Sequence, residues 1–552
     1  MPLQHNVFLL AFLVLNAISV ASQSPFQIVF KSQPKTEPTG TFQFHHPIRR
    51  VAVVGAGPSG LQTTARLVEH NFTVRLFDRA PHPGGNWQYS EETPVRESYP
   101  DRRAGDYYAE IPAQIPTRRY YQEGDDGLTL DYRWREHWRP RPVWYNLFTN
   151  SPKVSTELPD VPYDPEVPWV LNHDTIQRHV RSYASHHCLN SNDYCPPKAT
   201  PAAPPITSYS TRVERVEKDA ETHTWVLTLR RLERLPESNR ILEEWWTESF
   251  DAVFLAAGPW ASTHVPDIAG IVDWSKAKVG EQYSVYHSQT YRHPERYAGK
   301  AVLIVGSSVS ASEIARDISP YAHRIIASVR PPKELTVRRK LSLSRFPNAT
   351  EIVPEIASFE PLKTHTDGIR GGKIHLVNGS VLQDIDEIIL ATGYRSSPLY
   401  PYNLTTRTPE DTLWSGHWAQ DPTIAYSIGR TWTLGRYQAY GIAKVWAGKA
   451  QLPPLDRTED GETKPPSMEW FGEDIFRRYI TWLNEASLKY GGRFVDPPPI
   501  ENLEALKYYS VVHFLTANVT ALEDIGLSSI SMLSQQFLVE DPWDALVDED
   551  DD

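Results

Sequence analysis

The sequence predicts an α/β fold in which one pattern of secondary-structure elements occurs twice. Apolar strands at 51–54 and 301–305 each lead into a glycine-containing turn and a helix. Each helix is followed by a second strand, an antiparallel β-meander, and a strand that ends in small residues and glycine. This repeated order is typical of two nested Rossmann-like dinucleotide-binding domains with β-meander insertions.

Length and composition fit such a multidomain protein. The chain has 552 residues, more than one hydrophobic core usually contains, and 22% of them are charged, which is ordinary for a globular protein. With 56 Lys and Arg against 68 Asp and Glu, the formal net charge is −12. This sign argues against nucleic acid as a main partner.

The first strand, turn and helix match a dinucleotide-binding fingerprint. Gly55 allows the tight turn after the strand, Gly57 lets a pyrophosphate approach the backbone, and Gly60 lets the helix pack closely on the strand. The helix begins near Pro58 and Ser59, so its unpaired N–H groups are available to the phosphates.

The second strand of this unit, residues 73–77, is followed by Asp78. A carboxylate at this position accepts hydrogen bonds from a ribose diol and disfavours a 2′-phosphate. The first site is therefore expected to take an unphosphorylated ribose, as in FAD or NAD.

The second fingerprint departs from the first. Gly306 and Ser307 follow the apolar strand, but Ser308 occupies the second glycine position, where it crowds a phosphate, and Ser310 follows in the helix. The paired strand ends in Arg330 instead of an acid, and a cation there favours a 2′-phosphate, hence NADP. The alternative is a structural domain with a degenerate nucleotide site.

We interpret residues 1–22 as a signal peptide. Residues 7–20 are apolar except at Asn16 and Ser19, are too short to span a bilayer comfortably, and precede two small residues. An uncleaved anchor is the alternative. Because no later apolar run has transmembrane length, we expect no membrane span after signal removal, and a protein of the secretory pathway that is secreted or in the ER lumen.

Two further features fit a secretory route. Cysteine occurs only at Cys188 and Cys195, and in an oxidising compartment a disulfide is their expected state, with two inert thiols as the alternative. The predicted N-glycosylation sites are Asn71, Asn348, Asn378, Asn403 and Asn518.

Five further segments, taken in order and together with both fingerprints, resemble the flavin-containing monooxygenases over about residues 48–455. They are Gly84-Gly85-Asn86-Trp87, Tyr145 to Lys153, His287 with Tyr291, Ala391-Thr392-Gly393-Tyr394, and Gln438 with Leu452-Pro453. Half of the family's identifying sequence is absent, since Glu281 and Tyr283 stand where its Phe and Gly would fall. Tyr291 replaces the Trp usual in Baeyer–Villiger enzymes, which mildly favours heteroatom oxidation.

The resemblance implies an enzyme similar to N,N-dimethylaniline monooxygenase, with FAD in the first site and NADPH in the second. Gly85, Trp87, Thr392, Gly393 and Gln438 would then join the fingerprints in binding these cofactors. NADPH would reduce the flavin, O2 would add to it as a C4a-hydroperoxyflavin, and a small molecule with a soft nitrogen or sulfur would take one oxygen atom.

The resemblance also assigns a role to Asn150, which would hydrogen-bond near the peroxide and the retained NADP. An amide suits this place because it donates a hydrogen bond without titrating. The alternative is that Asn150 is a turn residue ahead of Ser151-Pro152. We expect His287 to be a structural histidine rather than a catalytic one.

The implied domain order begins with a linker at 23–47 and ends with an acidic, disordered tail at 540–552. The stretch at 88–142 has no clear period and is interpreted as a surface insertion, a candidate cap over a cleft. The domains are an FAD-binding domain whose first part is 48–265, an NADPH-binding domain at 266–394, and a second FAD-domain part with C-terminal helices at 395–539.

Three other functions remain open: a Baeyer–Villiger monooxygenase, a flavoprotein oxidase that releases hydrogen peroxide, and a non-enzymatic flavin-binding protein. Ser308 and the scarcity of NADPH in a secretory location are the features that support the oxidase. A disulfide reductase shares the architecture, but no C-x-x-C follows the first helix.

Overall fold

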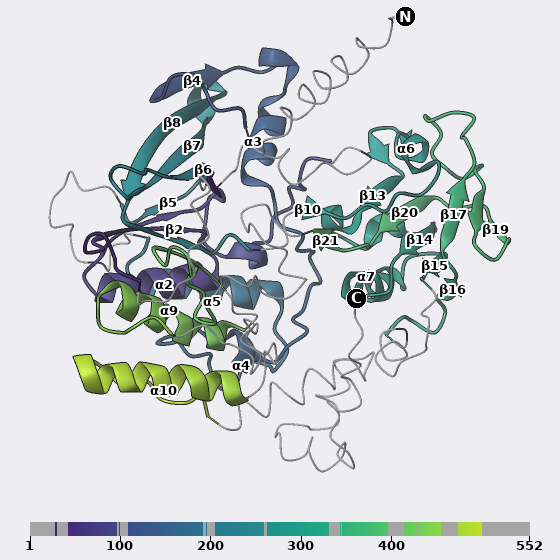
Figure 1. The fold of residues 1–552 in the computed structure, drawn as a ribbon. Coiled ribbons are helices and arrows are strands. Elements are labelled where there is room, and N and C mark those ends of the chain that lie inside the picture. Colours follow the sequence, from purple (N-terminus) through teal and green to yellow (C-terminus); the bar gives the residue numbers. More distant parts are fainter. Residues whose placement is uncertain are drawn as a thin grey trace, which may run out of the picture.

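The computed structural model describes residues 28–29, 42–96, 99, 109–190, 195, 205–258, 262–330, 343, 345–395, 413–427, 431–453 and 473–499. The predicted signal peptide at 1–22, the acidic tail at 540–552, and the sequons at Asn403 and Asn518 lie outside these residues. Figure 1 shows two halves, each built on its own parallel sheet. Among the helices of the described ranges, none combines the length and the apolarity that a membrane crossing requires.

The first parallel sheet has the strand order β22-β9-β2-β3-β5. Its strands are β2 (Arg50–Val54), β3 (Thr73–Phe77), β5 (Thr207–Ser208), β9 (Ala252–Leu255) and β22 (Ile424–Tyr426). All neighbours run parallel, and β2 lies in the middle with Val51, Ala52 and Val53 fully buried. Successive side chains of a strand point to opposite faces, so both faces of this sheet are covered.

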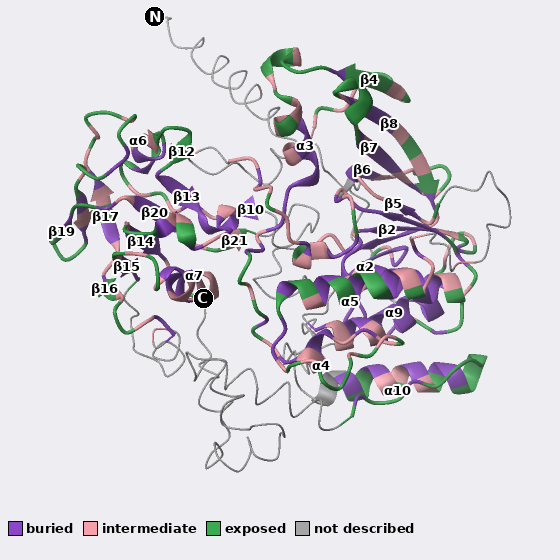
Figure 2. Cartoon of the chain, turned by 180° about the vertical axis from the view of Figure 1, so that it is seen from behind, coloured by how far each residue is buried: buried purple, intermediate pink, exposed green. Residues whose placement is uncertain are grey.

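Helices pack on this sheet and on one another. α2 (Pro58–Glu69), α5 (His173–His186) and α9 (Trp432–Trp446) lie together below the sheet in Figure 1, and α10 (Glu473–Tyr490) packs against α9. Figure 2 shows α2 and α9 mostly buried, whereas α10 has both buried and exposed positions. The α2 helix is therefore held between the sheet and a second helical layer, which fixes the turn at its N-terminus.

The second parallel sheet repeats the arrangement with the order β13-β20-β14-β15-β16. Its strands are β13 (Val285–His287), β14 (Ala301–Val305), β15 (Arg324–Ser328), β16 (Glu351–Val353) and β20 (Glu387–Leu390), and α7 (Val309–Ile318) follows β14. β14 lies between β15 and β20 just as β2 lies between β3 and β9. The predicted repetition of a dinucleotide-binding pattern is confirmed.

Both predicted meanders are present. The first contains β6 (Thr211–Lys218), β7 (Trp225–Leu235) and β8 (Arg240–Phe250), and the second contains β17 (Ile356–Phe359), β18 (Ile374–Leu376) and β19 (Val381–Leu382). In β7 the alternating residues Trp225, Leu227 and Leu229 are buried, as their period predicts. The predicted Asn378-Gly379 turn joins β18 to β19, and Gly379 has φ of +85°.

Two predicted segments contain more regular structure than expected. The predicted linker at 23–47 includes β1 (Ile28–Val29), which pairs with β6. The insertion at 88–142 includes β4 (Thr117–Tyr121), an edge strand on β8, and α3 (Leu130–Trp138), which packs beside β7. The described part of the insertion therefore extends the meander sheet, and only its role as a cap stays a prediction.

Short elements complete the described chain. They are α4 (Lys153–Thr156), α6 (Ile271–Trp274), β10 (Ser262–Thr263), β11 (Lys278–Val279), β12 (Gln282–Tyr283) and β21 (Tyr394–Arg395). β10 pairs with β21, so the chain after β9 is joined to the chain after β20. The predicted disulfide between Cys188 and Cys195 is present just after α5.

Candidate functional site

The loop between β2 and α2 is closed by backbone contacts that leave no space for side chains. Gly55 has φ of +106°, and a Cβ there would lie 2.5 Å from the carbonyl oxygen of Ala256. A Cβ on Gly60 would lie 1.8 Å from the carbonyl oxygen of Gly55. These two glycines therefore fix the turn and the helix–strand approach, as the fingerprint predicts.

A second glycine segment lies directly against this loop. The amide of Gly84 donates to the carbonyl oxygen of Ala56 over 3.1 Å, and a Cβ on Gly85 would lie 2.8 Å from Cα of Gly57. Trp87 continues this segment and packs against the core around α2 and α5. The sequence places these segments almost thirty residues apart, and the fold joins them into one bare-backbone cradle at the N-terminus of α2.

The cradle offers unpaired N–H donors. The N-cap of α2 is Gly57, which has no side chain to cap the first turn, and Pro58 follows. Ser59 accepts a hydrogen bond from the Oγ of Ser427 over 2.9 Å, which ties the first turn to the chain after β22. Free amides at a helix N-terminus stabilise a phosphate anion.

Asp78 lies beside the cradle with only 5% of its surface exposed. One carboxylate oxygen accepts from the amide of Ala56 over 2.6 Å, and the other accepts from the amide of Ala80 over 2.8 Å. The carboxylate is thus held in place by the loop, and each oxygen has a remaining lone pair for a ribose hydroxyl.

The loop between β14 and α7 repeats the first with one difference. Gly306 has φ of +131°, and a Cβ there would lie 2.3 Å from the carbonyl oxygen of Ala391. Ser308 is the N-cap of α7 in an extended conformation with φ of −91°, so its backbone does not require glycine. No side chain among the described residues caps α7, and Ser307 and Ser310 flank the free amides.

Arg330 follows β15 at the place predicted for the 2′-phosphate contact. Its side chain is 80% exposed, and its Nε donates to the Oε1 of Glu355 over 3.1 Å. An exposed guanidinium can leave such an ion pair at low cost. The position therefore fits recognition of a phosphate, although the carboxylate competes for the same donor.

The segment that contains Asn150 spans the two halves. The amide of Asn146 donates to Asp317 of α7 over 2.8 Å, and the backbone of Thr149 donates to the carbonyl oxygen of Leu171 over 2.8 Å. The hydroxyl of Tyr291 also donates to Asp317. Asn150 directly follows the second of these anchors and is exposed.

Arg292 is a further link between the halves, and no motif in the sequence predicts it. Its guanidinium is 6% exposed and donates five hydrogen bonds of 2.7 to 3.1 Å to main-chain carbonyl oxygens. The five acceptors are Ser90, Glu92, Arg141, Gln289 and Tyr291. Burial lowers the pKa of Arg292 to about 10, so the group stays charged at neutral pH.

Comparison with known proteins decides the family. Residues 53–123 match the NAD(P)-binding Rossmann-like domain, and residues 132–340 match the family described as flavin-binding monooxygenase-like. Flavin-containing monooxygenase iboF of Amanita muscaria is 32% identical over 505 residues, which cover 82% of this chain and 91% of that protein. The chain belongs to the flavin-containing monooxygenases.

Other members of the family agree with this assignment. Flavin-containing monooxygenase ustF2 of Aspergillus flavus is 28% identical over 453 residues, which cover 73% of this chain and 83% of that protein. The crystal structure of Tmm from Pelagibacter sp. strain HTCC7211 has a TM-score of 0.54 at 17% identity, over 88% of this chain and 92% of that chain. This likeness shows a shared fold.

Membership of the flavin-containing monooxygenases makes FAD and NADPH the cofactors. The cradle of Gly57 and Gly85 fits the diphosphate of FAD, because any Cβ there would fill the space above the free amides. The N-terminus of α7, with Arg330 beyond the second strand, fits NADPH. FAD in the first loop and NADPH in the second stay the predicted arrangement.

Thr392 and Gly393 follow β20, the strand next to the second loop. The hydroxyl of Thr392 donates to the carbonyl oxygen of His264, and the carbonyl oxygen of Gly393 accepts from the amide of His264 over 2.9 Å. Gly393 also accepts from the Nε2 of His287 over 3.0 Å, while Nδ1 of His287 accepts from the amide of Gln289. Both ring nitrogens of His287 are used by the chain, which confirms its structural role.

Gln438 lies in α9 and is fully buried. Its amide nitrogen donates to the carbonyl oxygens of Ser415 and Tyr426 over 3.2 and 2.7 Å. These bonds hold the chain beside β22 in place. The predicted contact of Gln438 with the flavin stays a prediction.

Buried neutral histidines predict a loss of stability in acid. Burial lowers the pKa of His287 and of His417 to about 3 from the ordinary 6.5. Both rings stay neutral in the folded protein and become protonated in the unfolded chain below pH 6.5, so the free energy of unfolding falls as pH falls. We expect a loss of about 2 kcal/mol per histidine between pH 6.5 and pH 5.

Denaturant unfolding at pH 7 and pH 5 measures this effect. His287→Gln and His417→Gln are each expected to reduce the difference between the two pH values by about 2 kcal/mol. His323→Gln, at the surface, is the control. A pH difference that is the same in all four proteins contradicts the prediction.

Proposed function

We propose that this flavin-containing monooxygenase transfers one oxygen atom from O2 to a soft nitrogen or sulfur of a small molecule. The observation that carries the proposal is the segment from Asn146 to Asn150, which joins the two halves: Asn146 bonds Asp317 in the last turn of α7, and Asn150 at the other end of the segment is exposed. We infer from it that the Asn150 amide lies between the flavin site and the NADPH site.

The residues of the chain bind, orient and shield. When bound, NADPH supplies a hydride and the flavin activates O2. The two glycine loops would hold the diphosphates, and Arg292 ties the second half to the segments that contain Ser90, Glu92 and Arg141. Asn150 donates a hydrogen bond without supplying a proton, and the occupied ring of His287 cannot supply one either.

Relatives support the choice of nitrogen and sulfur. The trimethylamine monooxygenase of Methylocella silvestris is 24% identical over 428 residues, which cover 74% of this chain and 77% of that protein. Its name describes oxidation of a tertiary amine. We extend to this chain only the class of substrate, a compact soft nucleophile.

Isotope labelling tests the reaction. The full-length protein is incubated with NADPH, ¹⁸O2 and, in turn, a tertiary amine, a thioether and a cyclic ketone. In the expected reaction NADPH, one proton, O2 and the amine or thioether give NADP⁺, water and a product that carries one ¹⁸O. An ester from the ketone supports a Baeyer–Villiger enzyme, and hydrogen peroxide without product supports an oxidase. A flavin that NADPH does not bleach overturns the proposal.

Asn150→Ala tests the proposed position of the amide. If Asn150 lies beside the reacting oxygen, the variant still oxidises NADPH but releases more hydrogen peroxide per NADPH and makes less product. An unchanged ratio of product to NADPH contradicts the role and supports a turn residue.

Arg330→Gln is expected to raise KM for NADPH about tenfold and to leave KM for NADH unchanged, because only NADPH carries the 2′-phosphate. Arg370→Gln removes another exposed arginine, which pairs with Asp386, and serves as the control. Equal changes in KM for both nucleotides would show that Arg330 does not read the phosphate.

We also propose that the protein is secreted or retained in the ER lumen. The apolar segment at 1–22 supports this, and the Cys188–Cys195 disulfide fits an oxidising compartment. The sequons at Asn71, Asn348 and Asn378 are exposed, so a glycosyltransferase can reach them. Expression in a eukaryotic host tests the proposal by N-terminal sequencing and by the mass lost on deglycosylation. An intact Met1 and no mass loss contradict it.

A further inference from the structure

Two arginines beside the first nucleotide loop have no partner within the described ranges. Arg79 directly follows Asp78, and Arg141 lies at the end of the insertion. Arg141 is 7% exposed, its Nε is buried without a hydrogen bond, and its guanidinium forms no ion pair with a described residue. A buried cation without a partner is costly, so such a group indicates a missing anion.

Hydrogen bonds place the last turn of α3, which precedes Arg141, close to the segment that contains Asp78. The ring of His137, in the last turn of α3, bonds the carbonyl oxygen of Ser210 over 2.8 Å. The amide of Ser210 in turn donates to the carbonyl oxygen of Ala80 over 3.0 Å, and the amide of Thr211 donates to the carbonyl oxygen of Asp78 over 2.8 Å. The end of α3 is therefore connected through Ser210 to the segment that follows β3, and the chain continues from there to Arg141.

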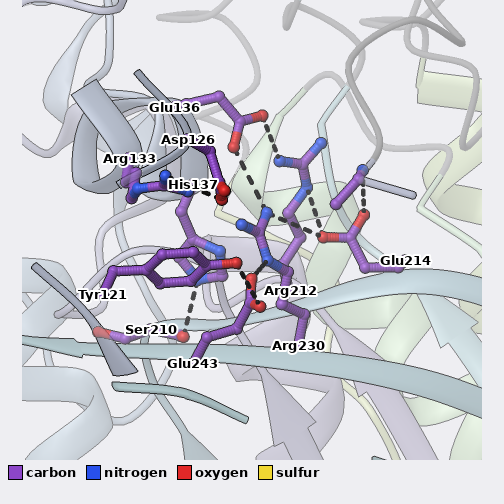
Figure 3. Close-up of polar contacts among 11 residues, drawn as sticks. Tyr121, Asp126, Arg133, Glu136, His137, Ser210, Arg212, Glu214, Arg230 and Glu243 are labelled. Carbon is purple, nitrogen blue, oxygen red and sulfur yellow. Dashed lines mark hydrogen bonds and ion pairs between the residues drawn. The ribbon is translucent and has the colours of Figure 1, made fainter. Parts of the chain in front are cut away.

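An ionic network holds α3 in this position, as Figure 3 shows. Glu136 of α3 pairs with Arg212 over 3.1 Å and with Arg230 over 3.4 Å. Glu214 is fully buried and pairs with Arg212 over 3.5 Å, and Glu243 pairs with Arg230 over 2.7 Å. The three acids of this network therefore neutralise Arg212 and Arg230 rather than Arg79 and Arg141.

The charge around Asp78 is unbalanced. Burial lowers the pKa of Arg79 well below its ordinary range, and the nearby charges of Arg141, Arg139 and Arg212 lower it further. Asp78 is the one acid that opposes this effect at Arg79 and Arg141 among the described residues, and both its oxygens already accept backbone amides. The arginines around Asp78 therefore carry positive charge that a bound anion would neutralise.

We propose that Arg141, supplied by the insertion, binds a phosphate in the adenosine half of FAD. The cradle of Gly57 and Gly85 adjoins Asp78, which accepts from the amide of Ala56 within that loop. The planar guanidinium carries five donors that match phosphate oxygens, so the backbone amides and Arg141 bind the diphosphate together. The inference rests on FAD as cofactor and not on the nature of the substrate.

Ligand titrations of the deflavinated full-length protein test this role. Arg141→Met keeps the length of the side chain and removes its charge, and we expect affinity for FAD and for ADP to fall about 10- to 100-fold. Affinity for adenosine, which lacks phosphate, stays unchanged, whereas an equal loss for adenosine would overturn the phosphate contact. Arg141→Lys keeps the charge but lacks the planar guanidinium. Its affinity for FAD and for ADP is expected to lie between those of the natural protein and of Arg141→Met.

Thermal unfolding without nucleotide separates binding from structure. Because Arg141 is a buried cation among like charges, Arg141→Met is expected to leave the Tm of the deflavinated protein unchanged or to raise it, while FAD raises that Tm less than in the natural protein. Arg178→Met, on the exposed face of α5, changes neither quantity. Wild-type affinity for FAD, or a lower Tm without nucleotide in both Arg141 variants, overturns the proposal. A natural protein that binds no FAD overturns the cofactor assignment instead.

Discussion

Gly60→Ala is expected to lower the free energy of unfolding by about 3 kcal/mol and to yield protein without flavin. The added Cβ would lie 1.8 Å from the carbonyl oxygen of Gly55, and backbone atoms cannot rotate away as a side chain does. The collision is relieved only if α2 moves away from β2. This movement also displaces the free amides at the N-terminus of α2. Denaturant unfolding and the ratio of flavin to protein absorbance measure the two effects.

Gly371→Ala is the matched control for this substitution. A Cβ on Gly371 meets no atom within 4 Å, so the same chemical change there creates no collision. We expect wild-type flavin content and a change of less than about 0.5 kcal/mol. A Gly60→Ala protein that behaves like the control would show that the helix and strand are not in the close contact described.

Arg292→Met is expected to lower the free energy of unfolding by about 3 to 5 kcal/mol. The substitution preserves much of the packing volume but leaves five main-chain carbonyl oxygens without their donor. Three of them belong to the segments around 90–92 and 141, so these segments are released from the second half. Denaturant unfolding gives the energy, and limited proteolysis near residue 92 reports the release.

Arg178→Met again serves as the control, because Arg178 is exposed and pairs only with Asp174 on the same helix. Arg292→Lys is informative as well, since an ammonium has three donors for five acceptors and is expected to fall between wild type and Arg292→Met. A loss below about 1 kcal/mol in Arg292→Met would mean that water replaces the guanidinium, contrary to its burial.

The fold was largely predictable because its signals are local. Gly55, Gly57 and Gly60 each answer a steric demand that shows in the spacing, and the apolar strands on either side identify the sheet. Asn378-Gly379 is predictable for the same reason, since a tight turn needs a residue with positive φ. The two fingerprints therefore led to both nucleotide loops.

Other parts depend on contacts between distant residues and gave no local signal. The side chains of β4 are mostly exposed, so Thr117–Tyr121 has no apolar alternation from which a strand could be predicted. Arg292 uses carbonyl oxygens about 150 and 200 residues away, and any residue type supplies a carbonyl. Arg141 looked like one of many arginines in a polar insertion, and only burial without a partner distinguishes it.

The backbone collisions at the two nucleotide loops also set how the enzyme tolerates mutation. The first glycine of each loop faces a carbonyl oxygen of the neighbouring strand, Ala256 for Gly55 and Ala391 for Gly306. In a saturation library, positions 55 and 306 should therefore return only glycine, whatever ligand is selected for. Position 308 already holds serine in an extended conformation, so it should accept several small residues. Attempts to retune nucleotide preference by directed evolution would begin at position 308 and leave position 306 untouched.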